Sequence, residues 1–189
     1  MSELESIRRR LDAAPVIPYE GVLVRCVALL PLMAGGAPDY LFTSGKPNRF
    51  NPGGARCVYF SENEETARME YARRLGTGTG AHQPLGTYFA EVRVARMLDL
   101  ADPATRDAAG LKARDMTAAW QRAKAPTRAQ RVGLVASQMG IAAIRFPSDA
   151  ARACGASGFN LVLFPAGVVA PDRVRILGPT RTPLQEWGR

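Results

Sequence analysis

The sequence is poor in the residues that build metal sites and disulfide frameworks. Its 189 residues include three cysteines, Cys26, Cys57 and Cys154, and a single histidine, His82. No two cysteines form a CxxC pair, so the common zinc sites made of thiolates and imidazoles are not expected. An odd number of cysteines also fits reduced thiols better than a disulfide framework. We therefore expect no metal.

Long apolar runs are missing as well. No stretch approaches the 18 consecutive apolar residues that would predict a transmembrane helix. The first residues, MSELESIRRRLDAAP, carry charges where a signal peptide would need an apolar centre. We expect a cytoplasmic protein that has no membrane partner.

Acidic residues are outnumbered, with 17 Asp and Glu against 25 Lys and Arg and a net charge of +8. This excess favours an acidic partner, which leaves nucleic acid, a phosphorylated ligand or an acidic protein open. The basic residues are scattered without aromatic interleaving and match no nucleic-acid-binding motif, so direct binding to nucleic acid is not expected. A compositional bias toward arginine explains the same charge without any partner.

Length and pattern together predict a single α+β domain. A chain of 189 residues with 47% hydrophobic content can bury one core. Strand-like segments come in clusters with helices inserted, which is typical of a mostly antiparallel sheet. The expected helices cover 2–13, 62–75, one or two segments between 103 and 123, and a segment from Thr127 to about 139; the expected strands cover 19–30, 40–43, 56–60, 87–94, 142–146, 159–164 and 174–177.

Three local details sharpen this interpretation. Ser61 and Glu64 have the spacing of a capping box, which predicts a helix that begins at Glu62. Residues 147–158 are expected to form a loop, and the chain after residue 178 a proline-rich tail. We therefore divide the chain into an N-terminal helical extension (1–18), a main domain (19–178) and a C-terminal tail (179–189).

One stretch, NRFNPGGARCVYFSENEETARMEYARR, combines a glycine-rich turn, a short strand and a helix. Arg49 lies in the turn, Tyr59 near the end of the strand and Glu70 near the middle of the helix. A guanidinium in a glycine-rich turn suits a diphosphate, because it can bond in a bidentate manner. A fixed carboxylate can stabilise positive charge that develops on a sugar ring during the cleavage of a glycosidic bond.

The order of these motifs resembles the RES domain family, named for an Arg, a Glu and a Ser. NRFNPGG supplies Arg49, VYFS supplies Tyr59, ARME supplies Glu70, and FPS before the NLVLF strand supplies Ser148. The resemblance runs from about residue 22 to 177. Arg25 corresponds to a further Arg of the family, although Cys26 follows it where several relatives have Tyr.

The resemblance implies a toxin of the Xre–RES type of toxin–antitoxin system, with a split β-core similar to ADP-ribosyltransferases. It implies that NAD is the substrate and that the nicotinamide–ribose bond is cleaved. Glu70 and Ser148 would be catalytic, while Arg25, Arg49 and Tyr59 would bind NAD. The acceptor, which is water, phosphate or a protein side chain, stays open. A cognate antitoxin with an Xre-like DNA-binding region is the implied partner.

Each residue also has an ordinary structural explanation. Glu70 can pair with Arg74 one helical turn on, Arg49 can be a solvated turn residue, Tyr59 a half-buried core aromatic, and Ser148 a turn or cap residue. A serine-hydrolase elbow GxSxG is absent. The rival to the enzyme is a non-enzymatic basic module that binds nucleic acid or an acidic protein.

Overall fold

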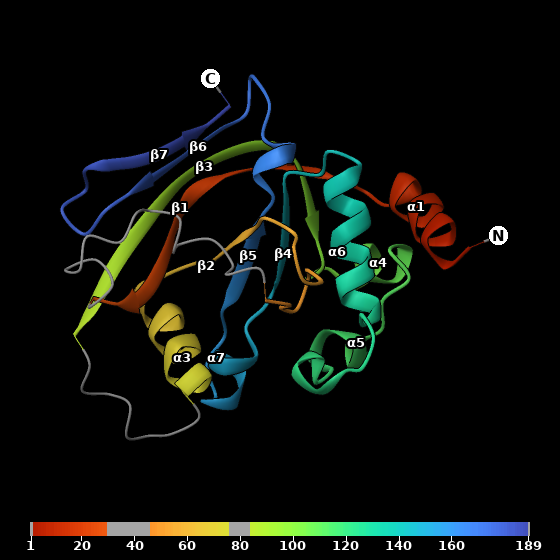
Figure 1. Cartoon of the computed structure of the whole chain (residues 1–189), viewed down its shortest axis with the longest axis horizontal. Coiled ribbons are helices and arrows are strands. Elements are labelled where there is room, and N and C mark those ends of the chain that lie inside the picture. Colours follow the sequence, from red (N-terminus) through yellow and green to blue (C-terminus); the bar gives the residue numbers. More distant parts are fainter. Residues whose placement is uncertain (1, 30–45, 76–83, 189) are drawn as a thin grey trace.

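The computed structural model describes residues 2–29, 46–75 and 84–188; His82 and the edge strand predicted at 40–43 lie outside these ranges. The helices are α1 Glu3–Ala13, α3 Glu64–Leu75, α4 Pro103–Ala108, α5 Ala113–Thr117, α6 Arg128–Gln138 and α7 Asp149–Ala153, with 3₁₀ turns at Trp120–Arg122 and Pro165–Gly167. The strands are β1 Ile17–Ala28, β2 Val58–Ser61, β3 Leu85–Asp99, β4 Ala143–Pro147, β5 Phe159–Leu163, β6 Arg173–Leu177 and β7 Pro183–Trp187 (Figure 1).

The described strands form one 7-stranded sheet in the order β1-β2-β5-β4-β3-β6-β7. β1 also pairs with β3, so the first five strands of this order close into a circuit. Among the strands of the described ranges, only β3 and β4 pair in parallel. The predicted α+β fold with a mostly antiparallel sheet is confirmed.

The long strand β3 joins the two ends of this circuit. It pairs with β1 from Leu85 to Val94 and again at Met97. Its middle, Phe89 to Arg93, pairs with β6, and Met97 to Asp99 pair with β4. Buried residues alternate along it, from Tyr88 through Ala90 and Val92 to Val94. This period of two is what a strand with one covered face requires. The predicted strand over 87–94 is confirmed and continues to Asp99.

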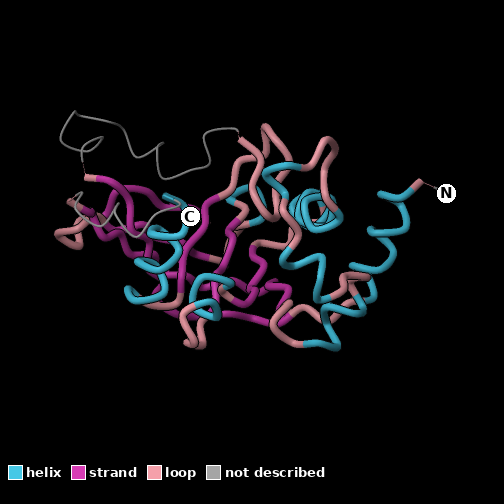
Figure 2. Tube along the Cα trace, turned by 90° about the horizontal axis from the view of Figure 1, so that it is seen from below, coloured by secondary structure: helices cyan, strands magenta, loops and turns pink. Residues whose placement is uncertain are grey.

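The helices cover the sheet from one side. α1 and α6 lie beside each other at one end of the molecule, far from the C-terminus, and α3 and α7 lie together beneath β2 and β5 (Figure 1). Figure 2 shows the strands as a curved layer with α1 at the N-terminal end. None of the helices in the described ranges is long and apolar enough to cross a bilayer.

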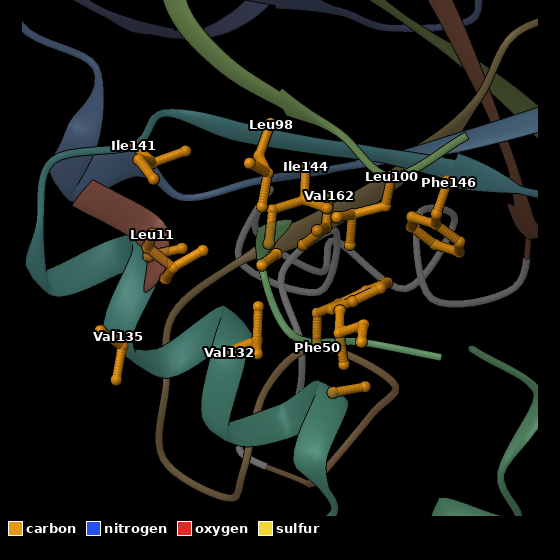
Figure 3. Close-up of a cluster of buried hydrophobic side chains, with 14 of the residues drawn as sticks. Leu11, Phe50, Leu98, Leu100, Val132, Val135, Ile141, Ile144, Phe146 and Val162 are labelled. Carbon is orange, nitrogen blue, oxygen red and sulfur yellow. The ribbon is translucent and has the colours of Figure 1, made fainter. Parts of the chain in front are cut away.

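Three apolar clusters of the described residues hold these layers together. One lies between the sheet and the helices α1 and α6, where Leu11, Val132 and Val135 meet Ile144 and other side chains of the strands (Figure 3). A second lies on the opposite face of the strands, and a third packs Ala67 of α3 against Val24 and Cys26 of β1. A fully buried side chain of this size contributes about 1.5–3 kcal/mol to folding. α1 is therefore anchored in the same core as the sheet.

Three local predictions are wrong. Asn63, rather than Ser61, caps α3: its Oδ1 accepts from Thr66 N at 2.8 Å, and the helix begins at Glu64. Residues 147–158 contain the helix α7. The strand over 174–177 is not the last, because Pro183–Trp187 pairs with it as β7. In contrast, the helix predicted from Thr127 is confirmed as α6, and Thr127 caps it in a capping box with Gln130.

Candidate active site

A tight turn carries Arg49. Asn48 and Asn51 exchange backbone hydrogen bonds, with N–O distances of 2.9 and 3.3 Å. The side chain of Asn48 also accepts from Arg49 N at 2.8 Å. Phe50 follows with a fully buried ring. The turn therefore places the partly buried Arg49 directly before a residue of the core.

The turn is held against α6 by a close backbone approach. A Cβ at Gly133 would lie 1.9 Å from Phe50 O, so only glycine admits the turn at this distance. Gln130, one helical turn earlier, donates from Nε2 to Asn48 O at 2.9 Å. Figure 3 shows Phe50 between α6 and the strands, beside Val132. The position of Arg49 is thus fixed by a helix far from it in the sequence.

Tyr59 of β2 supports the same turn. Its hydroxyl accepts from Phe50 N at 3.0 Å and donates to Asn51 Oδ1 at 2.9 Å. Its ring packs edge-on against Phe146, with centroids 6.4 Å apart. Burial raises the pKa of Tyr59 well above its usual value, which keeps the phenol neutral. Its hydroxyl is engaged by the turn, and contact between its ring and NAD stays a prediction.

Arg49 forms an ion pair with Asp149, the first residue of α7. Arg49 Nη2 lies 2.8 Å from Asp149 Oδ2, and the two side chains are 18% and 10% exposed. Arg49 Nη1 is buried and has no hydrogen-bond partner among the described residues. The guanidinium is therefore oriented through one nitrogen by Asp149 and is not a freely solvated turn residue.

The neighbouring residue, Ser148, connects α7 to Glu70. Ser148 caps α7 by accepting from Ala151 N at 3.1 Å. The same hydroxyl donates to Glu70 Oε1 at 2.7 Å. Glu70 therefore does not form the alternative pair with Arg74, and Ser148 serves as a helix cap and as a donor to the carboxylate together.

A second donor reaches the same oxygen from β5. Asn160 Nδ2 lies 2.6 Å from Glu70 Oε1, and Ser61 Oγ donates to Asn160 Oδ1 at 2.7 Å. Both donors to Glu70 are neutral, so neither of them neutralises a charge on the carboxylate. Among the described residues, Glu70 Oε2 has no hydrogen-bond partner. We call Ser61, Asn160, Glu70 and Ser148 the Glu70 network.

Arg25 lies on β1, directly after Val24, which pairs with Ser61 of β2. Its Nη1 donates to Tyr59 O at 3.0 Å. Burial lowers the pKa of Arg25 to about 10, and the positive charge of Arg74 adds to the shift. One nitrogen of the buried guanidinium is thus engaged by a backbone carbonyl, and contact between Arg25 and NAD stays a prediction.

The structure thus brings three of the five predicted site residues into one chain of contacts, which runs from Arg49 through Asp149 and the adjacent Ser148 to Glu70. Sequence reasoning missed Asp149, Asn160 and Ser61 as members. The signal for Asn160 was present, since an asparagine in the otherwise apolar run FNLVLF needs a buried partner.

Two hollows on the surface lie away from the Glu70 network. A hollow of about 240 Å³ lies between α1 and α6, and one of about 630 Å³ surrounds Gly110. Neither is lined by a member of the Glu70 network. No group of three or more histidine, cysteine or acidic side chains in the described ranges could hold a metal ion.

Comparison with known proteins identifies the family of this chain. The model of the RES domain matches residues 25–184, most of the chain. The chain belongs to the RES domain family. Among solved structures, it is similar to a chain of the M. tuberculosis MbcT–MbcA toxin–antitoxin complex, with a TM-score of 0.61 and 19% identity over 93% of this chain and 94% of that one. No curated protein matched. At this identity the structural likeness establishes a shared fold.

Proposed function

We propose that this RES domain protein is the toxin of a toxin–antitoxin pair, and that it binds NAD and cleaves the nicotinamide–ribose bond. The observation that carries the proposal is the Glu70 network. It holds one carboxylate by two neutral donors, at distances of 2.6 and 2.7 Å to the same oxygen. Family membership and the fold shared with a toxin–antitoxin complex support the same conclusion.

Glu70 has the properties that the reaction requires. When the bond between ribose C1′ and nicotinamide breaks, the electron pair leaves with nicotinamide, and positive charge develops on the ribose. A carboxylate that no cation neutralises and that is already oriented stabilises this charge without reorganising. We assign Glu70 to a ribose hydroxyl beside C1′ and Ser148 to the orientation of its carboxylate.

Arg49 and Arg25 would bind the diphosphate of NAD. A guanidinium forms charge-assisted bonds to phosphate oxygens, and Asp149 already fixes the plane of Arg49. Arg25 lies next to Tyr59, whose hydroxyl supports the turn that carries Arg49. The net charge of +8 favours the approach of an anionic substrate.

Release of nicotinamide from NAD by the purified protein is the primary test. The proposal predicts nicotinamide and the loss of NAD in proportion to protein concentration. A folded protein that binds NAD and releases no nicotinamide would contradict it. The assay with and without phosphate, and with labelled NAD and cell lysate, separates hydrolysis, phosphorolysis and ADP-ribose transfer to a protein target.

The antitoxin would cover the face that carries Arg25 and Arg49. We propose an Xre-type partner that presents acidic side chains or a terminal carboxylate to these arginines, because opposite charges must meet where a cationic site is blocked. Crosslinks between the two proteins should fall on α3, α7 and the turn of Arg49. Crosslinks confined to the hollow around Gly110 would contradict this placement.

A non-enzymatic basic module is the second candidate, and the hollow around Gly110 is the observation that favours it. Arg10, Lys112, Arg114 and Arg128 line it, with Asp107 and Asp115. A titration against random DNA separates the two functions, since binding dominated by phosphate contacts weakens steeply with salt. Tight, salt-sensitive binding without nicotinamide release would establish the module.

A further inference from the structure

The hydrogen bonds around Asn160 have a fixed direction. An ionised carboxylate can only accept, so the group 2.6 Å from Glu70 Oε1 must be the amide nitrogen of Asn160. The amide oxygen then faces Ser61, whose hydroxyl must donate to it. One hydroxyl therefore determines which end of the amide meets Glu70.

The sheet holds this pair rigidly. Ser61 and Asn160 are directly opposed in the β2–β5 ladder, and Asn160 also pairs with Phe146 of β4. β5 is thus bonded on both sides, and its asparagine is 6% exposed while Ser61 is 5% exposed. A buried amide is tolerated because both of its ends are bonded. Glu70, in contrast, stands on a helix beside the sheet.

We propose that Asn160 is a positioning residue for Glu70, and that Ser61 locks the orientation of its amide. This positioning role rests on the proposed function and concerns the same site. Asn160 and Ser148 both bond Oε1, which fixes the plane of the carboxylate from two sides. The second oxygen is then presented to the ribose in one orientation.

Replacing Asn160 by alanine tests this directly. Asn160→Ala should lower kcat roughly 10- to 100-fold, while KM for NAD changes less than about threefold, because the orientation of the catalytic group is lost and the binding groups remain. Ser61→Ala should lower kcat by a smaller factor. The matched control is Thr105→Val, which also removes a buried hydroxyl with a bond of 2.7 Å, here to Asp102, and should leave kcat unchanged.

Asn160→Asp adds a readout that a purely structural asparagine would not move. Two adjacent carboxyl groups share one proton, and the protonated one can donate where the amide did. Activity should therefore recover in part at acid pH and fall toward neutral pH. Asp149, Arg49, Arg25 and Glu62 lie on the surrounding elements and stay unchanged in this comparison with wild type.

The thermal midpoint of Asn160→Asp gives a readout that is independent of activity. The folded-state pKa of the new carboxyl pair is raised above its unfolded value. The contribution of this pair to the stability of the variant is therefore present at low pH. It is lost as the pH rises through the folded-state pKa of the pair. The midpoint should fall below that of wild type increasingly between about pH 5 and 8. A pH-independent difference would show that residue 160 does not face Glu70 and would overturn the inference.

The remaining outcomes separate the inference from the proposed function. Active wild-type protein whose kcat is unchanged in Asn160→Ala would overturn the positioning role alone. A loss of kcat equal to that in Thr105→Val would do the same, because it would reflect general destabilisation. Wild-type protein that releases no nicotinamide would overturn the proposed function, and the positioning role with it.

Discussion

Two carboxylates on the same helix, α3, have contrasting environments. Glu64 in the first turn is about half exposed and pairs with Arg68 four residues on, at 2.7 Å. Glu70 in the middle of the helix is partly buried and accepts from Ser148 and Asn160, which come from α7 and β5. The first pair is local and solvated, whereas the second brings together three elements distant in sequence.

The difference lies in what happens to the charge. Arg68 neutralises Glu64, and solvent screens the pair, so this contact contributes little to stability or function. The donors to Glu70 are neutral, so its charge is oriented but retained. A carboxylate that is fixed and not neutralised suits the stabilisation of a cationic transition state.

Glu70→Gln should produce the largest loss. The change keeps size and helix propensity and removes the negative charge, so nicotinamide release should fall about 10²-fold or more. The thermal midpoint should change little, and cells that express the variant should keep their NAD and their growth. Turnover at the wild-type rate, measured as nicotinamide release, would remove Glu70 from the mechanism.

Arg49→Ala should weaken NAD binding roughly 10- to 100-fold, because charge-assisted bonds to the diphosphate are lost. Arg49→Lys should restore part of the affinity, since lysine keeps the charge but loses the planar fork. Calorimetric titration with NAD measures both variants. Equal affinity in wild type and both variants would show that the diphosphate binds elsewhere.

Tyr59→Phe should have an intermediate effect. It removes the hydroxyl that bonds Phe50 N and Asn51 Oδ1, so the turn carrying Arg49 loses two contacts. We expect a cost of about 1–3 kcal/mol in the free energy of unfolding and a severalfold loss of NAD affinity. Denaturant unfolding and NAD titration provide the two values. A stability loss with unchanged affinity would separate the turn from the binding site.

Glu64→Gln should have the smallest effect and serves as the control for Glu70→Gln. It makes the same chemical change on the same helix and breaks a solvated pair. Activity and thermal midpoint should both match wild type within error. A loss of activity comparable to that of Glu70→Gln would show that the general charge of α3, and not the network, governs the reaction.

The sequence predicted the parts of the fold that are encoded locally. The cap of α6 at Thr127 depends on neighbouring residues, and the strand in 87–94 on alternation within a few positions. The order of the family motifs predicts Arg49, Glu70 and Ser148 as site residues. Their contacts connect residues far apart, such as Ser148 and Glu70 at a separation of 78 positions.

The incorrect predictions concern segments whose structure depends on a partner that is distant in the sequence. Ser61 and Asn63 can both cap a helix. The hydroxyl of Ser61 instead donates to Asn160, 99 positions away, and Asn63 caps α3. The proline-rich segment before Trp187 does not look like a strand, yet pairing with β6 makes it one. Local propensity cannot reveal such choices because the deciding contact forms only in the folded chain.

A crystal structure of the Glu70→Gln variant with NAD tests the role of Glu70 most directly. We expect intact NAD, with a ribose hydroxyl within hydrogen-bond distance of the side chain at position 70 and the diphosphate on Arg49 or Arg25. NAD bound in the hollow around Gly110, or with its nicotinamide ribose away from position 70, would contradict this account.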